Sequence, residues 1–397
     1  MSLVFVLGAC SKKKQPEGAP SGEPPPWGSV VPVVAPRPGM VWIPAGTLVA
    51  GSDLSSIPRV PDAEPAATPM NLSGFYIDMY LSPNEAGSLP LANMTRDEAS
   101  KLCAAQEKRL CTELELERAC KGPDNAVFAY GDEYREDVCG TGKKGDSVIP
   151  NGHNNLCVSP FGVHDLQGSI WTWTASDYGR GTTGLVAVRG GNGPHGRLVA
   201  RCANVRAEKP NAKAPNIGVR CCAGPVNTAK VDIAVDRSGP ALRLHRNDTA
   251  LAQRFTLAIS GLATVAEGAY PPETPHHGPS VLDPARFVVE RTWSWQPLGN
   301  EALVLAGGCA SPDAVSTHKA CGLFVGREAS DKVTILFFVA TGPWQPTIGE
   351  PSDARILPVQ GGDDAGSFRK LVAWEWGRVS IVGTQRSKAG QRWVNER

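Results

Sequence analysis

The chain has 397 residues, a formal net charge of +1 and 20% charged side chains. The charge is balanced, and no basic stripe interleaved with aromatic residues is present in the sequence. This pattern argues against nucleic-acid binding through attraction to the phosphates. The length favours two folded domains, since one hydrophobic core rarely grows past about 250–300 residues. The 43 glycines and 34 prolines predict strands and loops rather than long helices.

The first ten residues, MSLVFVLGAC, form a short apolar run that ends on small residues and Cys10. The run is similar to the lipobox of bacterial lipoprotein signal peptides, although it lacks the usual preceding basic residues. The resemblance implies export, a lipid on Cys10, and a membrane anchor in the cell envelope, at the outer membrane or the periplasmic face. The alternative is a buried apolar terminus that carries a cysteine by chance.

Residues 11–39 are rich in Pro, Gly, Ser and Lys and contain little that could be buried. This composition predicts a disordered, partly polyproline tether. A flexible spacer behind an anchor would let a folded domain stand off a membrane.

Alternating apolar residues predict the first strands. MVWIPAGTLVAGS (40–52) is typical of a strand, a glycine turn and a second strand, and GFYIDMYLS (74–82) of a further strand. In the segment 162–179, Trp171 and Trp173 lie on one side of a short strand. They could line a ligand groove, but core packing is favoured because an indole buries a large apolar area.

Two helices are predicted from their N-terminal caps. Each begins with a capping box, a threonine followed three residues later by a glutamate: Thr95 and Glu98 in 94–109, then Thr112 and Glu115 in 109–122.

Beside Cys10 there are ten cysteines, at positions 103, 111, 120, 139, 157, 202, 221, 222, 309 and 321. An even set in an exported chain predicts disulfides. Zinc is the alternative, but no CxxC pair or suitably spaced histidine supports it. Spacing leaves most pairings open, although Cys139–Cys157 flank one polar loop and Cys309–Cys321 are close enough to bridge another.

The second half of the chain reads as strands without a helix. Residues 225–240 are expected to form a linker, and 241–397 a β-rich domain, either a small barrel or a sandwich. The strands are expected in 286–308, 332–341 and 368–386. His276 and His277 lie in a Pro-rich loop, where a solvated turn is favoured over a weak metal site.

Six segments of residues 40–224 resemble the sulfatase-modifying factor family, which includes formylglycine-generating enzymes. In chain order they are MVWIPAG, FYIDMY, RLCTELELERAC, PFGVHDLQGSIWTWT, VRGG and RCANVR…NIGVRCC. The resemblance implies a C-type-lectin-like fold, so we expect an α+β class for the chain, with the β-rich domain following.

The resemblance also implies two long-range disulfides, Cys103–Cys221 and Cys120–Cys202. Each would tie a predicted helix to the last strands of the domain. Cys111 and Cys222, next to the first pair, are then expected to form a parallel bridge, Cys111–Cys222.

Active members of the family carry two further cysteines before the RC motif, one five and one about ten residues upstream, and these bind copper. Here the two positions are Arg197 and Asn192. Neither can supply the thiolate that copper(I) requires, so copper is not expected. His195 is the nearby alternative, but a lone imidazole makes a poor copper site, and a surface turn explains it better.

The family's calcium-associated GNxWEW segment is also altered. It reads GSIWTW at 168–173, with hydroxyls in place of an amide and a carboxylate, which puts the calcium site in doubt. Asn151, Asn154 and Asn155 offer oxygens, but an Asn-rich turn explains them. The seven histidines show no spacing for an iron site.

The resemblance places five residues on or near the loops of the family's pocket, where an anionic or peptide ligand would suit them: Asp177, Tyr178, Arg180, Arg197 and Arg201. The favoured function is therefore a ligand- or protein-binding module, without catalytic residues or a cofactor, in a cell-envelope lipoprotein. Two alternatives remain: an oxidase that converts a client cysteine to formylglycine, and a structural envelope component.

Overall fold

The computed structural model describes residues 35–54, 56, 58–142, 148–193, 196–235, 241–245, 248–270, 280–297, 299–311, 319–349, 356–375, 378–387 and 393–395. Cys10, His195 and the His276–His277 pair lie outside the described residues. The described part of the chain is mostly β with few helices. The α+β class expected from the sequence is therefore not confirmed.

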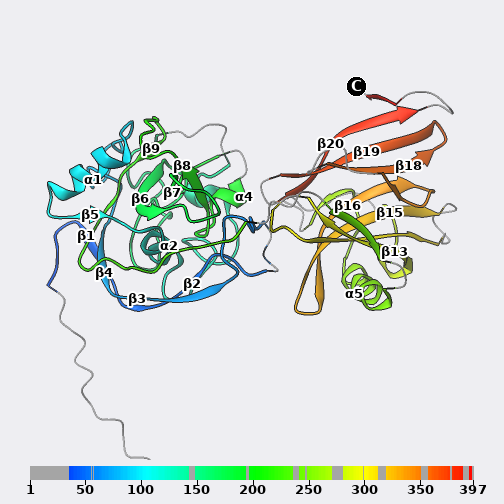
Figure 1. Cartoon of the computed structure of the whole chain (residues 1–397), viewed down its shortest axis with the longest axis horizontal. Coiled ribbons are helices and arrows are strands. Elements are labelled where there is room, and N and C mark those ends of the chain that lie inside the picture. Colours follow the sequence, from blue (N-terminus) through cyan, green and yellow to red (C-terminus); the bar gives the residue numbers. More distant parts are fainter. Residues whose placement is uncertain are drawn as a thin grey trace, which may run out of the picture. The chain divides into compact units, whose positions relative to one another are not determined.

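Residues 40–223 build three small sheets (Figure 1). The first has the order β1 (Met40–Ile43), β4 (Phe75–Asp78), β10 (Cys221–Ala223), β5 (Arg109–Leu110). The second has the order β8 (Val205–Glu208), β7 (Val186–Gly190), β6 (Trp171–Asp177), β9 (Ile217–Gly218). The third pairs β2 (Gly46–Ala50) with β3 (Thr68–Leu72). The strands predicted in 40–52 are both present, but they belong to different sheets.

Both predicted helices form, as α1 (Arg96–Ala104) and α2 (Glu113–Lys121). Each has the predicted capping box, in which the threonine side chain accepts from the glutamate backbone N–H and the glutamate side chain accepts from the threonine N–H. Two helices of one turn, α3 (Glu136–Cys139) and α4 (Gly196–Val199), were not predicted. They are too short to show a helical period.

Trp171 and Trp173 belong to the core between α1 and the second sheet. The Trp173 indole N–H donates to the carbonyl of Met94 at 2.9 Å, which satisfies its polar atom inside the protein. The guanidinium carbon of Arg206 lies 4.5 Å from the Trp171 ring centroid. Core packing is therefore confirmed for both tryptophans.

The segment expected to form a linker packs against the first domain as far as Ile233. Val231 is buried with Leu48 and Leu114, and the Ile233 N–H donates to the carbonyl of Gly179 at 2.9 Å. The Asn227 amide donates to Glu115 at 2.9 Å. Residues 225–233 are thus part of the folded domain.

Residues 241–395 contain two antiparallel sheets that share a core. The first sheet has the order β11 (Ala241–His245), β13 (Phe287–Gln296), β14 (Leu303–Ala310), β15 (Ala320–Ala329), β16 (Lys332–Gly342), β12 (Gly268–Ala269). The second has the order β17 (Thr347–Ile348), β18 (Ile356–Asp363), β19 (Gly366–Glu375), β20 (Arg378–Ser387), β21 (Val394–Asn395). Apolar residues of both sheets, including Trp295 and Trp374, are buried in one cluster.

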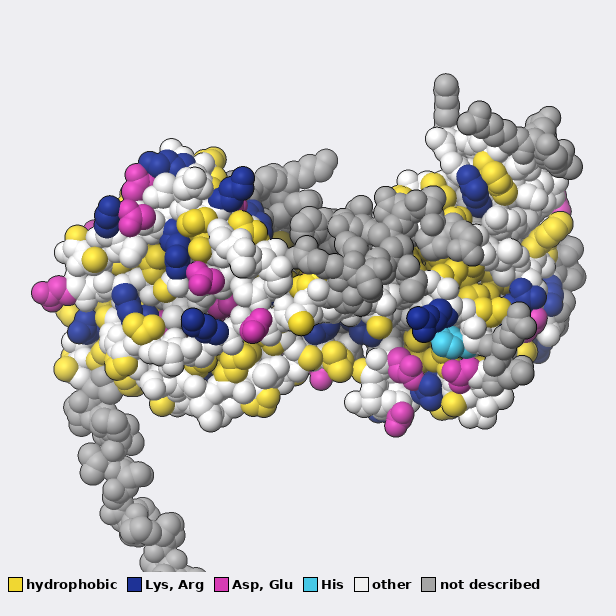
Figure 2. All heavy atoms as spheres, viewed as in Figure 1, with side chains coloured by type: hydrophobic (Ala, Val, Ile, Leu, Met, Phe, Trp, Pro, Cys, Tyr) yellow, Lys and Arg dark blue, Asp and Glu magenta, His cyan; other side chains and the backbone are white. Residues whose placement is uncertain are grey.

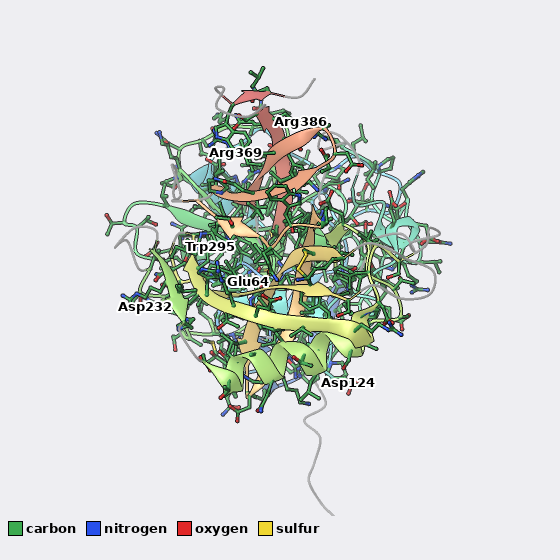
Figure 3. All side chains as sticks on the ribbon, turned by 90° about the vertical axis from the view of Figure 1, so that its right-hand side faces the viewer. Glu64, Asp124, Asp232, Trp295, Arg369 and Arg386 are labelled. Atoms are coloured by element: carbon green, nitrogen blue, oxygen red, sulfur yellow. A yellow bond between two sulfur atoms is a disulfide. The ribbon has the colours of Figure 1, made fainter. Side chains whose placement is uncertain are left out.

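A helix, α5 (Thr249–Ser260), covers the other face of the first sheet (Figure 3). The expectation of no helix in this half was wrong. Leu251, Phe255 and Ile259 recur every fourth residue and form a narrow buried stripe. Asp248 caps the helix by accepting from the Leu251 N–H at 2.9 Å. A 3₁₀ turn, Pro284–Arg286, precedes β13.

None of the described helices is both long and apolar enough to cross a membrane. On the face shown in Figure 2, basic and acidic side chains are interspersed without a broad patch of either sign. This distribution agrees with the small net charge.

Candidate functional site

All ten described cysteines are oxidised and buried, with no more than 2% of any of them exposed. The five disulfides are Cys103–Cys221, Cys111–Cys222, Cys120–Cys202, Cys139–Cys157 and Cys309–Cys321. These are the pairs expected from the sequence. Such a set is typical of a chain that is exported and folds in an oxidising compartment.

Asn192, which stands about ten residues before the RC motif, has a structural role. Asn192 is buried, and its side-chain N–H groups donate to the carbonyls of Gly140 at 3.1 Å and Gly168 at 3.3 Å. Its oxygen accepts from the Gly142 N–H at 3.1 Å. Asn192 therefore holds two loops together where an active family member would present sulfur.

The donors present do not fit the metals that the family would imply. Copper(I) needs sulfur ligands, and the two upstream positions supply an amide and a guanidinium. In the altered calcium segment, the Ser169 hydroxyl is buried without a hydrogen-bond partner, but no carboxylate stands beside it in GSIWTW. Across the described ranges, no three His, Cys, Asp or Glu side chains group to hold a metal ion.

Helix α2 carries a buried network of ion pairs. Glu113 accepts from Arg180 at 2.9 Å and from Arg189 at 3.0 Å. Glu117 contacts Arg189 at 2.9 Å and Lys121 at 3.1 Å. Burial by itself would lower the pKa of Arg189, but the two carboxylates hold that pKa above its usual value. The network fixes α2 against β7 and the chain around Arg180.

Arg180 is part of this scaffold and is not available to a ligand. It is fully buried, and besides Glu113 it donates to the carbonyls of Ala63 and Tyr178. Its guanidinium carbon lies 4.8 Å from the Tyr178 ring centroid. The expectation that Arg180 binds a ligand was wrong, because a buried guanidinium must be paired within the fold. Asp177 lies exposed at the end of β6.

Arg197 and Arg201 do line one cavity, of about 400 Å³. Its walls come from three parts of the chain: residues between Val49 and Ala67, residues between Lys121 and Asp132, and residues 197–203 in and just after α4. Arg201 is buried and paired with Glu64, with NH1 to Oε2 at 2.7 Å. Lys121 donates to the carbonyls of Val49 and Gly51 at 2.6 Å. The cavity therefore has a mixed polar wall rather than a cluster of uncompensated cations.

The Glu64–Arg201 pair predicts a specific pH dependence. Burial opposes ionisation of Glu64, but Arg201 and Ser52 hold the pKa of this carboxyl below its usual value. Its contribution to stability is therefore complete above the unfolded pKa, about 4.3, and is lost as pH falls through the lower folded value. We expect Glu64→Gln to lower the free energy of unfolding most at pH 7, and the difference from wild type to shrink below about pH 4. Urea unfolding across this range measures it, and a difference that grows on acidification would contradict the assignment.

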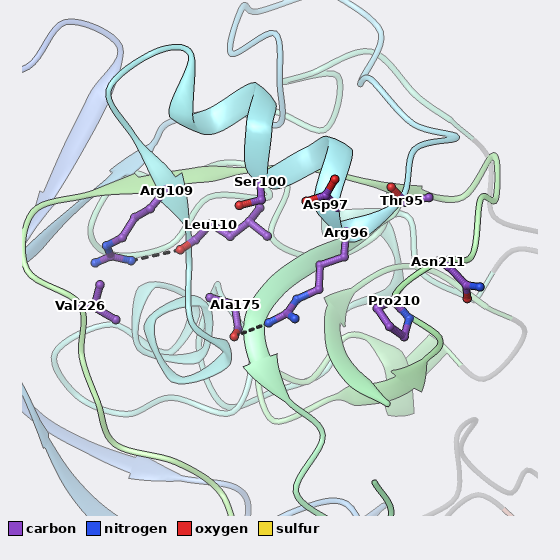
Figure 4. Close-up of a pocket in the computed structure, with 10 residues that line it drawn as sticks. All are labelled: Thr95, Arg96, Asp97, Ser100, Arg109, Leu110, Ala175, Pro210, Asn211 and Val226. Carbon is purple, nitrogen blue, oxygen red and sulfur yellow. Dashed lines mark hydrogen bonds between the residues drawn. The ribbon is translucent and has the colours of Figure 1, made fainter. Parts of the chain in front are cut away.

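A second cavity, of about 590 Å³, lies beside the start of α1 (Figure 4). Arg96 and Arg109 are prominent in its wall. The Arg96 Nε donates to the carbonyl of Thr174 at 2.9 Å, and Arg109 is paired with Glu115 at 2.8 Å. Sequence reasoning missed this cavity, because its lining comes from five separate places in the chain: 95–100, 109–110, 175, 210–211 and 226. Both guanidiniums are held by bonds within the fold, so they form part of the cavity wall.

Residues 81–224 match the family model of the sulfatase-modifying factor enzyme 1-like domain, which confirms the resemblance over that range. Two curated proteins are similar, both named inactive C-alpha-formylglycine-generating enzyme 2. The Bos taurus protein is 29% identical over 155 residues, which cover 34% of this chain and 50% of that protein. The Mus musculus protein is 28% identical over 153 residues, which cover 34% and 48%.

The chain thus spans about half the length of the curated relatives it matches. Among solved structures, PvdO from Pseudomonas aeruginosa aligns with a TM-score of 0.39 and 18% identity, covering 47% of this chain and 99% of that one. Treponema denticola variable protein 1 aligns with a TM-score of 0.37 and 13% identity, covering 47% and 95%.

Proposed function

We propose that residues 40–224 form a non-catalytic binding module of a cell-envelope lipoprotein, and that the cavity beside Arg197 receives a peptide segment of a partner protein. One observation carries the proposal: every described cysteine is in a buried disulfide, so none of these ten side chains offers a thiolate for copper or for sulfur chemistry. The similarity to proteins named inactive agrees with it.

The mixed wall of the cavity favours a peptide over a bare anion. Arg201 is paired with Glu64, and Lys121 contacts backbone carbonyls and Glu117. Asp132 adds a carboxylate that accepts from the Val127 N–H at 3.0 Å. Alternating donors and acceptors suit a peptide backbone, which presents both.

The anchor is proposed from Cys10 and the tether that follows it. A diacyl group together with one further acyl chain would give stable attachment to a membrane, which a single chain does not give. The five disulfides support export, because they need an oxidising compartment.

The catalytic alternative predicts turnover that the binding module does not. We expect no aldehyde when the purified chain is incubated with a Cys-x-Pro-x-Arg peptide and copper and the peptide is analysed by mass spectrometry. Reactions with an active formylglycine-generating enzyme provide the positive control. Any catalytic formation of aldehyde would refute the proposal.

Binding is tested with a panel of immobilised peptides of matched length, acidic and neutral. We expect retention of a subset, and Arg197→Ala to weaken that retention about tenfold, which is the loss of one charged hydrogen bond. Lys101→Ala, which removes an exposed cation outside the cavity, is the matched control. If no peptide is retained, the structural envelope component becomes the better account.

A further inference from the structure

The second sheet of the C-terminal half packs one face into the shared core, and a row of polar side chains crosses its opposite face. Leu357 and Val359 of β18 are completely buried in the core shared by the two sheets. Because side chains alternate along a strand, Gln360 and Gly362 lie on the opposite, outer face. One row of polar side chains crosses this face, directly paired over four strands: Gln360 with Arg369, Arg369 with Gln385, and Gln385 with Asn395.

Trp344 lies flat on this outer face. A Cβ atom built on Gly362 would come within 2.9–3.0 Å of three atoms of the Trp344 ring system. Since these atoms are nearly equidistant, the indole presents its face to the strand, and only a glycine leaves room for it. The side chain is nevertheless 57% exposed, so the opposite ring face is turned to solvent.

A second tryptophan lies beside the polar row. The guanidinium carbon of Arg369 is 4.8 Å from the ring centroid of Trp393. The Arg369 Nε in turn donates to the Gln385 side-chain oxygen, and Gln385 donates to Asn395 at 2.9 Å. The row is thus held in place by its own hydrogen bonds. Figure 3 shows Arg369 on the strands of this sheet.

We propose that this outer face binds a polysaccharide chain. A sugar ring has an apolar face of C–H groups that stacks on the electron-rich face of an indole, and hydroxyls at its rim that both donate and accept. Trp344 lies over β18, and Trp393 is near β19 and β21. Neighbouring strands are about 4.8 Å apart, and β21 is three strands from β18, so the two indoles would stack on different rings of one chain. Between them, amides and a guanidinium offer planar donors and acceptors to the hydroxyls.

Single-stranded nucleic acid is the other polymer that stacks on exposed indoles. It also needs several cations to neutralise phosphates, and its binding is strongly salt-dependent. The outer row contains one guanidinium, and that group is already engaged with Gln385 and Trp393. A neutral or amino-sugar polysaccharide therefore fits this face better.

The full chain is tested by sedimentation with insoluble cellulose, chitin and purified bacterial peptidoglycan. We expect retention on at least one of them that persists in 0.5 M NaCl. Trp344→Ala and Trp393→Ala should each weaken retention about tenfold, since each removes one stacking platform. Gly362→Ala keeps both tryptophans but displaces the Trp344 ring, so it should also weaken retention. Leu257→Ala, which changes a 74% exposed residue of α5, is the matched control and should retain wild-type binding.

Circular dichroism of each variant separates lost binding from lost folding. Three results would overturn the proposal: no retention on any of the three polymers, equal weakening by Leu257→Ala, or retention of the folded Trp344→Ala, Trp393→Ala and Gly362→Ala variants at the wild-type level. Salt-sensitive binding of a single-stranded oligonucleotide without polysaccharide retention would also overturn it, in favour of nucleic acid. None of these outcomes bears on the cavity beside Arg197, whose test uses peptides.

Discussion

Glu113→Gln is expected to lower the free energy of unfolding by about 3–5 kcal/mol, because breaking a buried ion pair leaves an uncompensated charge inside the protein. Glu113 is 1% exposed, and Arg180, with which it pairs, is fully buried. Without the carboxylate, the Arg180 guanidinium keeps only neutral acceptors, and Arg189 loses one of its two carboxylates. Glutamine has nearly the same shape, so the change isolates the charge. Urea unfolding of both proteins at pH 7 measures the loss.

Asp97→Asn is the matched control. Asp97 forms an ion pair with Lys101 at 2.7 Å, but both side chains are about three-quarters exposed. An exposed pair of this kind contributes about 0–1 kcal/mol. If Glu113→Gln costs no more than Asp97→Asn, the buried network does not hold α2 in place.

Removing the Cys120–Cys202 disulfide by a double change to alanine is expected to cost about 4.5 kcal/mol. The bond joins residues 82 positions apart, and closing a loop of that length restricts the unfolded chain by this amount in the loop-entropy model. The Cys309–Cys321 bond, with a separation of 12, should contribute about 3 kcal/mol by the same reasoning. Thermal or urea unfolding of the two double variants gives the comparison.

Thiol titration shows whether Cys202 has the assigned partner. Cys202→Ala should release one thiol more than the wild type under denaturing, non-reducing conditions, because Cys120 is left unpaired. A number one lower than that of the wild type would mean that Cys202 is free in the native protein. That result would reopen sulfur chemistry at this position.

Local features were readable in the sequence because neighbouring residues alone create them. The capping boxes at Thr95 and Thr112 need only four consecutive residues. The bridges Cys139–Cys157 and Cys309–Cys321 close short loops. Helix α5 had a readable signal as well, since Asp248 precedes an apolar residue at every fourth position, but the surrounding strand patterns obscured it.

The candidate site could be predicted only in part. The family resemblance located Arg197 and Arg201, which do line one cavity. Arg201 is nevertheless buried in an ion pair with Glu64, and Arg180 is buried in the same way against Glu113. A sequence does not distinguish an arginine that pairs inside a fold from one that faces a ligand, because the partner comes from a distant segment.

By itself, the sequence determined the caps, several of the strands, the even cysteine set and the presence of Asn192 and Arg197 at the two positions upstream of the RC motif. Only the tertiary structure decided that the glutamates of ELELER are buried. Three acids spaced two residues apart on a helix are typical of an exposed surface, but arginines from other segments neutralise them. The structure also decided that Trp344 lies flat over Gly362, which is two residues from Gln360 on the strand that pairs with Arg369. Long-range pairing creates both features, and short-range sequence patterns do not encode it.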